Sequence, residues 1–220
     1  MSQGGLMIRM RKTAAMVAGT AAVGAAGWLW FGDRAPFPYS QRWMLDVPLP
    51  MLTGARLDAI LQPRPGERML EIGPGTGLQA LHIAPQLGES GRLDVLDVQP
   101  EMLSHVLRRA GDLDITNIVA TQADARCLPF DDGSFDAVYL ITALGEIPDI
   151  GAVLREAERV LTPDGRLVVG EFFDPHWVTL TTLLTHADAA GLHLTTRSGL
   201  GPAYLARLHP CRKARGTHAA

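Results

Sequence analysis

Three glycines, Gly73, Gly75 and Gly77, lie in one turn that follows the short apolar segment 69–72. Glycine has no Cβ, so a ligand can lie directly against its backbone. The first amides of a following helix lack partners within the helix and can receive an electron-rich group. This strand–turn–helix segment therefore predicts a site for a nucleotide-like ligand. Its spacing is G-x-G-x-G with Leu78 next, whereas a dinucleotide-binding turn has G-x-G-x-x-G.

Two aspartates follow the next two apolar segments. Asp97 lies 20 residues after Gly77 in the sequence, and its carboxylate can accept hydrogen bonds from both hydroxyls of a ribose. The competing interpretation is that Asp97 caps the next helix. Asp124 follows the segment 118–121, and its carboxylate can accept a hydrogen bond from an amino group. Asp97 is thus a candidate for contact with a nucleoside, and Asp124 for contact with an amino group.

Strands and helices alternate along most of the chain. This alternation predicts a parallel sheet covered on both faces, and two final strands without a helix between them predict an antiparallel strand at one edge. Ligands of such sheets bind at the carboxyl ends of the strands, where both aspartates and the glycine turn are expected. Strands are predicted at 69–72, 93–98, 118–121, 135–141, 167–172, 192–196 and 203–208, helices at 52–61, 78–87, 100–110, 150–161 and 177–190, and a turn at 162–165.

In order and spacing, five segments resemble the motifs of the class I S-adenosylmethionine (SAM)-dependent methyltransferases. They are LEIGPGTGLQA (70–80), the strand that ends at Asp97, ADARCLPF (123–130), FDAVYLI (135–141) and LTPDGRL (161–167). Within that class the chain is most similar to the ubiquinone/menaquinone C-methyltransferase-like (methyltransferase type 11) group. The resemblance covers residues 52–209. It implies an α/β fold with a seven-stranded Rossmann-like sheet, mostly parallel with an antiparallel edge strand, and helices on both faces.

The same resemblance implies S-adenosyl-L-methionine as the cofactor and methyl transfer as the activity. Asp97 is then expected at the ribose and Asp124 at the adenine amine, with the backbone amide of Ala125 facing the adenine ring. The residues expected to bind the cofactor are Glu71, Gly73, Gly75, Gly77, Asp97, Val98, Met102, Asp124, Ala125 and Ile141.

Two residues are candidates for catalysis. Glu146 follows the fourth core strand, where it could act as a general base or anchor an amine; the alternative is a surface charge at a helix N-terminus. His176 follows the fifth core strand, and its alternative is a purely structural role. Trp177 is a candidate for an apolar acceptor wall, although its helical spacing from Leu180 and Leu184 favours core packing. The other aromatic candidates for this wall are Tyr39, Trp43, Phe172 and Phe173.

Composition narrows the function classes. An apolar fraction of 47% and a charged fraction of 20% are those of a globular protein. A net charge of −3 gives no reason to expect a nucleic-acid partner. The partner that the methyltransferase resemblance implies is a small-molecule acceptor. Cys127 and Cys211 lack Cys or His neighbours at metal-ligand spacing, so no metal site is expected. Two isolated thiols also suit a reducing compartment.

Residues 13–31 form a 19-residue run without a charge, preceded by Arg9, Arg11 and Lys12. That length is enough for a membrane span. The run is interpreted as an anchor, a cleaved export signal or the product of too early a start codon. Because SAM is made in the cytosol, we expect membrane association through residues 13–31 with the catalytic domain in the cytoplasm; otherwise the protein is cytoplasmic.

Four regions are expected along the chain: a hydrophobic N-terminal segment (1–32), a connector with cofactor-covering helices (33–62), the SAM-binding methyltransferase domain (63–209) and a basic tail (210–220). The predicted function is methyl transfer to a small hydrophobic or membrane-derived acceptor, of the quinone, lipid or natural-product kind. One alternative is a non-catalytic SAM-binding protein of the same fold. A nicotinamide-dependent oxidoreductase is a third hypothesis, which the glycine spacing disfavours.

Overall fold

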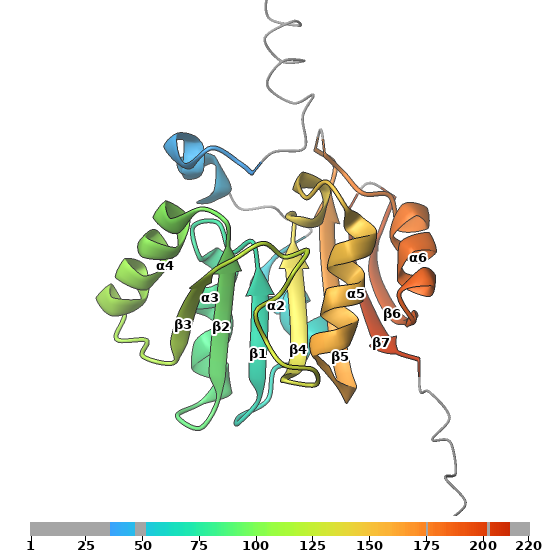
Figure 1. The fold of residues 1–220 in the computed structure, drawn as a ribbon. Coiled ribbons are helices and arrows are strands. Elements are labelled where there is room, and N and C mark those ends of the chain that lie inside the picture. The colour runs from blue at the N-terminus through green and yellow to red at the C-terminus, as the bar shows by residue number, and fades with distance from the viewer. Residues whose placement is uncertain (1–35, 47–51, 175, 202, 212–220) are drawn as a thin grey trace, which may run out of the picture. The chain divides into compact units, whose positions relative to one another are not determined.

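The alternating apolar segments form the seven strands of a single sheet (Figure 1). The computed structural model describes residues 36–46, 52–174, 176–201 and 203–211. Along the sheet the strand order is β3-β2-β1-β4-β5-β7-β6. The strands are β1 (Arg68–Ile72), β2 (Arg92–Asp97), β3 (Ile118–Gln122), β4 (Phe135–Ile141), β5 (Leu161–Phe172), β6 (Leu192–Leu200) and β7 (Ala203–Pro210).

The first five strands run parallel, and β7 is antiparallel to both of its neighbours, β5 and β6. From β1 the chain adds β2 and β3 on one side and then returns to add β4 and β5 on the other side. The strand order therefore reverses between β1 and β4. This arrangement confirms the predicted fold class, with the antiparallel β7 lying between β5 and the edge strand β6.

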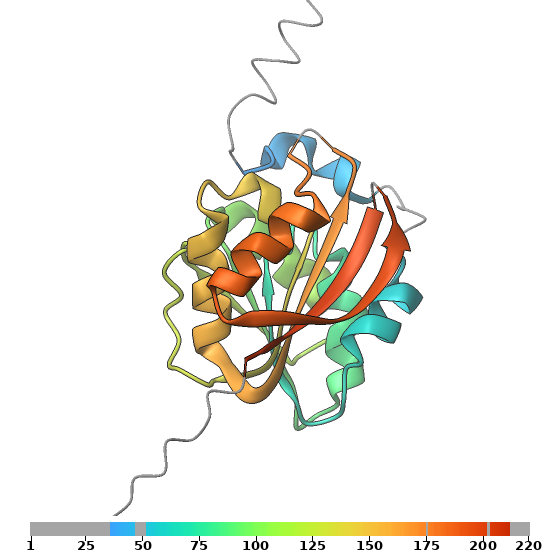
Figure 2. The same ribbon diagram turned by 90° about the vertical axis from the view of Figure 1, so that its right-hand side faces the viewer.

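Helices cover both faces of the sheet, as Figures 1 and 2 show. On one face α2, α3 and α4 pack against one cluster of buried side chains, and on the other face α5 and α6 pack against a second cluster. The α-helices are α2 (Gly54–Leu61), α3 (Leu78–Ile83), α4 (Pro100–Asp112), α5 (Ile150–Val160) and α6 (Leu180–Ala189). The 3₁₀ helices are η1 (Tyr39–Asp46), η2 (Ala84–Leu87) and η3 (Leu144–Glu146).

Three local predictions differ from the structure. The helix expected at 78–87 divides into α3 and η2, because Pro85 has no N–H to continue an α-helix. The helix expected from residue 177 begins at Leu180, where the side chain of Thr179 accepts a hydrogen bond from the Thr182 N–H. The turn expected at 162–165 belongs to β5, which pairs through Leu161 with β4 and then shifts register.

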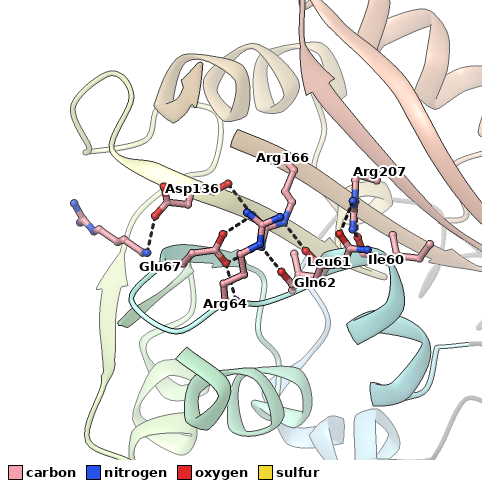
Figure 3. Close-up of polar contacts among 9 residues, drawn as sticks. Ile60, Leu61, Gln62, Arg64, Glu67, Asp136, Arg166 and Arg207 are labelled. Atoms are coloured by element: carbon pink, nitrogen blue, oxygen red, sulfur yellow. Dashed lines mark hydrogen bonds and ion pairs between the residues drawn. The ribbon is translucent and has the colours of Figure 1, made fainter. Parts of the chain in front are cut away.

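A buried arginine joins α2 to the sheet (Figure 3). Arg166, on β5, is 6% exposed and forms a bidentate ion pair with Glu67, with both N···O distances 2.8 Å. It also donates to the carbonyl oxygens of Leu61 and Gln62 at the end of α2. Cations are favoured at a helix C-terminus, where carbonyl groups lack partners within the helix. Arg166 therefore satisfies the end of α2 and fixes this helix against the sheet.

Arg207, on β7, repeats this contact beside Arg166. It donates to the carbonyl oxygen of Ile60 and, at 3.0 Å, to the side-chain oxygen of Gln62 (Figure 3). Gln62 itself has a left-handed backbone, with φ of 52°. The two arginines thus close the end of α2 from neighbouring strands, which holds the helix that leads into β1.

No helix in the described part of the chain is long and apolar enough to cross a membrane. The segment 13–31, for which membrane association is predicted, lies outside the described residues.

Replacing Arg166 by glutamine is expected to lower the free energy of unfolding by about 3 kcal/mol, because the largely buried ion pair with Glu67 and the charged contact with two carbonyls at the end of α2 would be lost. Urea unfolding followed by circular dichroism measures this change. The matched control is Arg126→Gln, which breaks an exposed ion pair with Asp124 and should cost about 1 kcal/mol or less. Equal losses in both variants would contradict the role assigned to Arg166.

Candidate functional site

The glycine turn follows β1 at the point where the strand order reverses. Gly73 has φ of 69° and its N–H donates to the Leu96 carbonyl of β2 at 2.8 Å. A Cβ at position 73 would lie 2.6 Å from the Cβ of Ala143, which follows β4. Glycine is therefore required here by both the backbone conformation and the close approach of the loop after β4.

The other two glycines meet different neighbours. A Cβ at Gly75 would lie 3.0 Å from Leu45 of η1, and one at Gly77 would lie 3.1 Å from Val106 of α4. All three glycines have positive φ values. The turn is thus enclosed by the loop after β4, by η1 and by α4, while Gly73 and Gly75 stay partly accessible.

Asp97 ends β2 beside this turn. It is 9% exposed, and its Oδ1 accepts a hydrogen bond from the Gln99 N–H at 2.9 Å. Burial raises the pKa of the Asp97 carboxyl above its ordinary value, although hydrogen bonds from backbone amides partly oppose this shift. Asp97 therefore lies at the carboxyl edge of the sheet, as predicted. Its hydrogen bond with the Gln99 N–H orders the loop between β2 and α4.

Glu71 lies deeper in the sheet. It is 2% exposed, and its Oε2 accepts a hydrogen bond from the Tyr139 hydroxyl at 3.0 Å. Burial raises the pKa of Glu71 to about 8, so the carboxyl is protonated at neutral pH. Tyr139 pairs with Glu71 across β1 and β4. This contact therefore joins the two strands between which the strand order reverses, directly beneath the glycine turn.

Asp124 follows β3 and is already paired. Its carboxylate accepts hydrogen bonds from the Arg126 backbone and guanidinium, the shortest of them 2.6 Å, and these bonds lower the pKa of Asp124. The next residue, Ala125, is buried. The remaining predicted cofactor residues lie at other strand ends and helix starts. They are the exposed Val98, the buried Met102 and the partly buried Ile141.

Residues 36–46, here named the cover segment, cross this edge of the sheet (Figures 1 and 2). The Phe37 N–H donates to Glu146 Oε2 at 3.0 Å, and the Phe37 carbonyl accepts from Gln99 Nε2 at 2.9 Å. Gln99 follows β2 and Glu146 follows β4, and these strands lie on opposite sides of β1. The backbone of Phe37 thus bridges the loops on both sides of the reversal point.

A second contact holds the other end of the cover segment. Asp46 Oδ1 accepts hydrogen bonds from the Thr76 hydroxyl at 2.8 Å and from Arg109 Nη1 at 3.0 Å. The same Arg109 nitrogen donates to the Thr76 carbonyl at 2.9 Å. Thr76 lies inside the glycine turn and Arg109 on α4. The cover segment is therefore fixed at both ends over the candidate site.

Three carboxyl groups interact at this edge. The pKa of Glu146 is raised to about 7, chiefly by burial and also by the nearby charges of Asp174 and Asp97, against the opposing effect of the Phe37 hydrogen bond. Burial also raises the pKa values of Asp97 and Asp174. Like charges close together disfavour ionisation, and a bound cation would relieve this repulsion. The edge is therefore suited to a positively charged ligand or to a group that takes up a proton.

The second catalytic candidate, His176, lies beside the loop that carries Glu146. A Cβ at Gly145 would collide with the carbonyl oxygen of His176, so the loop after β5 packs directly on η3. The His176 N–H donates to Asp174 Oδ1 at 2.7 Å. Glu146 and His176 are thus brought into neighbouring loops, as expected for residues that follow β4 and β5.

Glu171, near the end of β5, is a buried acid of this region that sequence reasoning missed. It is 1% exposed, its Oε2 accepts from the Val178 N–H at 3.3 Å, and its Oε1 has no hydrogen-bond partner in the described residues. The pKa of Glu171 is raised to about 8, chiefly by burial and also by the charges of Asp174 and Glu146, although hydrogen bonds from the backbone partly oppose this shift. No pattern in the sequence marks this residue, because its apolar neighbours indicate only a buried strand.

Further residues that shape the candidate site were also not predicted from the sequence. Thr142 directly follows β4 with φ of 55°, a backbone conformation that residues other than glycine seldom adopt. Its N–H donates to the Gly170 carbonyl of β5 at 2.7 Å. The partners of the cover segment, Gln99, Thr76 and Arg109, were missed as well. Each depends on a contact between residues distant in the sequence, so only its position near a strand end could have drawn attention to it.

The buried carboxyl of Glu171 predicts a pH dependence of stability. The folded state keeps this proton up to about pH 8, whereas an ordinary glutamate loses it near 4.5, so the free energy of unfolding should fall as pH rises between 5 and 8. Glu171→Gln is expected to reduce this fall by about 1 kcal/mol or more. Urea unfolding at several pH values measures it.

Glu156→Gln is the control for this measurement. The ion pair with Arg159 lowers the pKa of Glu156, so its contribution to stability changes only below the ordinary value of 4.5. The control should keep the wild-type slope between pH 5 and 8. A Glu171→Gln slope equal to that of wild type would show that this carboxyl does not remain protonated.

Asp46→Ala is expected to release the end of the cover segment, because Thr76 and Arg109 lose their shared acceptor. Trypsin should then cleave after Arg42 several times faster than in the wild type, as followed by mass spectrometry. Global stability should change by about 1 kcal/mol or less, since this ion pair is partly exposed. Asp58→Ala, which breaks a comparable exposed contact with His82, is the control. Cleavage at the wild-type rate would contradict the fixing role of Asp46.

Solved structures support the fold described above. A SAM-dependent methyltransferase from Aquifex aeolicus aligns with a TM-score of 0.72 and 19% identity, over 79% of this chain and 98% of that one. The [4+2]-cyclase SpnF aligns with a TM-score of 0.60 and 24% identity, over 66% of this chain and 57% of that one. A cyclase in the same fold illustrates that the fold alone does not determine the reaction.

Sequence comparison identifies the family. A ubiquinone/menaquinone biosynthesis C-methyltransferase UbiE from Cellvibrio japonicus is 40% identical over 114 residues, which are 51% of this chain and 46% of the relative. The chain spans about half the length of curated relatives that it matches, this one and a UbiE from Edwardsiella ictaluri. The model of the ubiE/COQ5 methyltransferase family matches residues 54–186, which include the glycine turn, Asp97, Asp124 and Glu146. The resemblance seen in the motifs is thereby confirmed, and the chain belongs to the ubiE/COQ5 methyltransferase family.

Proposed function

We propose that this protein is a SAM-dependent methyltransferase that acts on a small hydrophobic acceptor of the quinone, lipid or natural-product kind. The observation that carries the proposal is the meeting of the glycine turn, Asp97 and Glu146 where the strand order reverses, beneath the cover segment. Ligands of open parallel sheets bind at this point. Membership of the ubiE/COQ5 methyltransferase family supports the cofactor and the type of reaction.

The residues at the site fit SAM. The partly accessible backbone of Gly73 and Gly75 lacks side chains that would block a ligand, and the Asp97 carboxylate offers acceptors for the two ribose hydroxyls. The positive charge of SAM suits an edge that carries the carboxyl groups of Asp97, Glu146 and Asp174. Both the shape of the turn and the charge of its surroundings therefore support this cofactor over a neutral ligand.

Individual roles follow from this assignment. We assign the ribose to Asp97, with Val98 and Met102 on the same side, and the adenine to Asp124 and the amide of Ala125. Asp124 would have to share its carboxylate between the adenine amine and Arg126, which now occupies it. Ile141, at the end of β4, lies near the methionine part. Glu71 supports the turn from below through Tyr139, because its buried side chain has that hydroxyl as its partner.

When bound, SAM supplies a methyl group on a positively charged sulfur, which is already electrophilic. The protein's remaining task is to align the acceptor, exclude water and remove a proton where the acceptor loses one. Glu146 is suited to the last step, because its pKa of about 7 lets it hold or release a proton at neutral pH. Its bond to the Phe37 N–H would orient the carboxyl. His176, in the neighbouring loop, is the second candidate.

The cover segment gives these residues a common enclosure. Phe37 joins the loop beside Asp97 to the loop that carries Glu146, so the part proposed to hold the cofactor and the part proposed to take the proton are linked by one residue. Closing a site in this way excludes water and strengthens the electrostatic interactions inside it. The cover segment is therefore proposed to align the acceptor with the cofactor.

The experiment that tests the proposal is calorimetric titration of the full chain with S-adenosylhomocysteine, with NADH as the control ligand. We expect micromolar binding of S-adenosylhomocysteine alone. Binding of NADH instead would favour the oxidoreductase alternative. A folded sample that binds neither would contradict the proposal, and binding without turnover on quinol, phenol and amine acceptors would favour a non-catalytic member of the fold.

Asp97→Asn is expected to weaken S-adenosylhomocysteine binding by about 10- to 100-fold, because charge-assisted hydrogen bonds to the ribose become neutral ones. Asparagine keeps an oxygen that can accept the Gln99 N–H, so the loop should retain its structure. Calorimetry measures the change, and circular dichroism verifies folding. Asp188→Asn, an exposed change on α6, should leave the affinity unaltered. An Asp97→Asn affinity equal to wild type would exclude Asp97 from the cofactor site.

A further inference from the structure

A pocket of about 490 Å³ lies between the first turn of α6, the loop after β5 and the β6–β7 hairpin. Its volume is within the range of small-molecule sites. Aromatic rings of Phe173, Trp177 and Tyr204 line it, together with Leu180. Phe173 and Trp177 are in edge-to-face contact, with ring centroids 5.5 Å apart. These walls suit a flat apolar body, which aromatic side chains contact favourably.

The same pocket has a cationic wall. Arg197, on β6, lines it from the hairpin side. In the described part of the chain its side chain has no hydrogen bond, ion pair or ring contact. An arginine guanidinium presents several N–H donors in a planar fork that matches a carboxylate or phosphate. Arg197 is thus a cation without a partner in the described part of the chain, beside an apolar cavity.

The N-terminus of α6 provides a second attraction for an anion. Thr179, Leu180 and Thr181 line the pocket, and they form the cap and first residues of this ten-residue helix. The unpaired amides and the dipole at a helix N-terminus favour a negatively charged group. Arg197 and the start of α6 belong to different elements on the same pocket, so both favour an acid group there.

Glu171, a buried acid beside the pocket residue Tyr204, does not oppose this assignment. Tyr204 lines the pocket, and its hydroxyl donates to the Val178 carbonyl at 2.8 Å. The Val178 N–H in turn donates to Glu171 Oε2 at 3.3 Å. Burial raises the pKa of Glu171 to about 8, so its carboxyl is uncharged at neutral pH. Among the described residues that line the pocket, Arg197 is the one charged side chain.

The pocket also borders the candidate catalytic loops. Trp177 directly follows His176, whose carbonyl oxygen packs on Gly145, and Glu146 is the next residue. In Figures 1 and 2 the loop after β5 and the β6–β7 hairpin reach the same edge of the sheet as the cover segment. A molecule bound between Trp177 and Arg197 would thus lie next to the loop that carries Glu146.

We propose that this pocket binds the acid group and apolar body of the acceptor, so that the acceptor is an aromatic or similarly flat molecule with a carboxylate or phosphate held by Arg197. The identification of this ligand as the methyl acceptor rests on the proposed function; the anion site itself does not. Arg197 is a specificity-determining residue in this proposal, because it selects acidic over neutral molecules of the same shape.

The test uses the full chain, saturated with S-adenosylhomocysteine or free of it, and three probes of one shape: 2-naphthoate, 2-naphthyl phosphate and the neutral 2-naphthamide. Calorimetry should show that wild type binds at least one acid about 10-fold or more tightly than the amide. Arg197→Gln should remove this preference, and Arg197→Lys should restore part of it. Arg155→Gln, an equal charge change on α5 outside the pocket lining, should retain it.

The outcomes separate the two proposals. Equal binding of acids and amide by wild type, or a preference that survives Arg197→Gln, would overturn the anion site. The acid that shows the larger Arg197-dependent preference identifies the group as carboxylate or phosphate. Arg197→Gln should bind S-adenosylhomocysteine with the wild-type affinity. A folded wild-type sample that does not bind S-adenosylhomocysteine would contradict the proposed function, but it would not contradict the anion site in this pocket.

Discussion

Between β1 and β4 the chain reverses the direction in which it adds strands to the sheet, and every feature of the candidate site depends on this reversal. The loops after β1, β2 and β4 diverge there, and Gly73 lets two of them approach within contact distance. Glu71 and Tyr139 join the two strands beneath the turn. A site at this point is open enough to receive a ligand and is surrounded by the ends of several strands.

The cover segment connects the loops on the two sides of the reversal point and encloses the candidate site. Its hydrogen bonds to the rest of the described chain are few, two at Phe37 and two at Asp46, and all four connect it to loops or helices of the site itself. Partly exposed polar contacts of this kind contribute little to global stability. The far end of the connector is held differently, since Arg166 and Arg207 bind the end of α2 in a mostly buried network. The structure thus combines a firmly held helix with a weakly held cover over the site.

Charge is distributed unevenly along the carboxyl edge of the sheet. Near the reversal point, Asp97, Glu146 and Asp174 concentrate carboxyl groups whose pKa values burial raises. Beyond the loop after β5, the pocket carries Arg197 and the N-terminus of α6. A cationic cofactor and an anionic acceptor would each meet surroundings of opposite charge. Trp177 and His176 lie between the two regions, so the proposed binding sites for the two ligands share one loop.

The sequence by itself determined the order of strands and helices, the glycine turn and the acidic residues at strand ends, because these depend on local periodicity and on residues adjacent in the chain. Family motifs added the fold, which the sheet confirms. Only the tertiary structure decided the partners: Glu146 with Phe37, Asp46 with Thr76, and Arg166 with the end of α2. These contacts join residues 30 to 109 positions apart, and no local pattern encodes such pairs. The protonation of Glu171 and the uncommitted charge of Arg197 likewise follow from burial and neighbours, which exist only once the chain has folded.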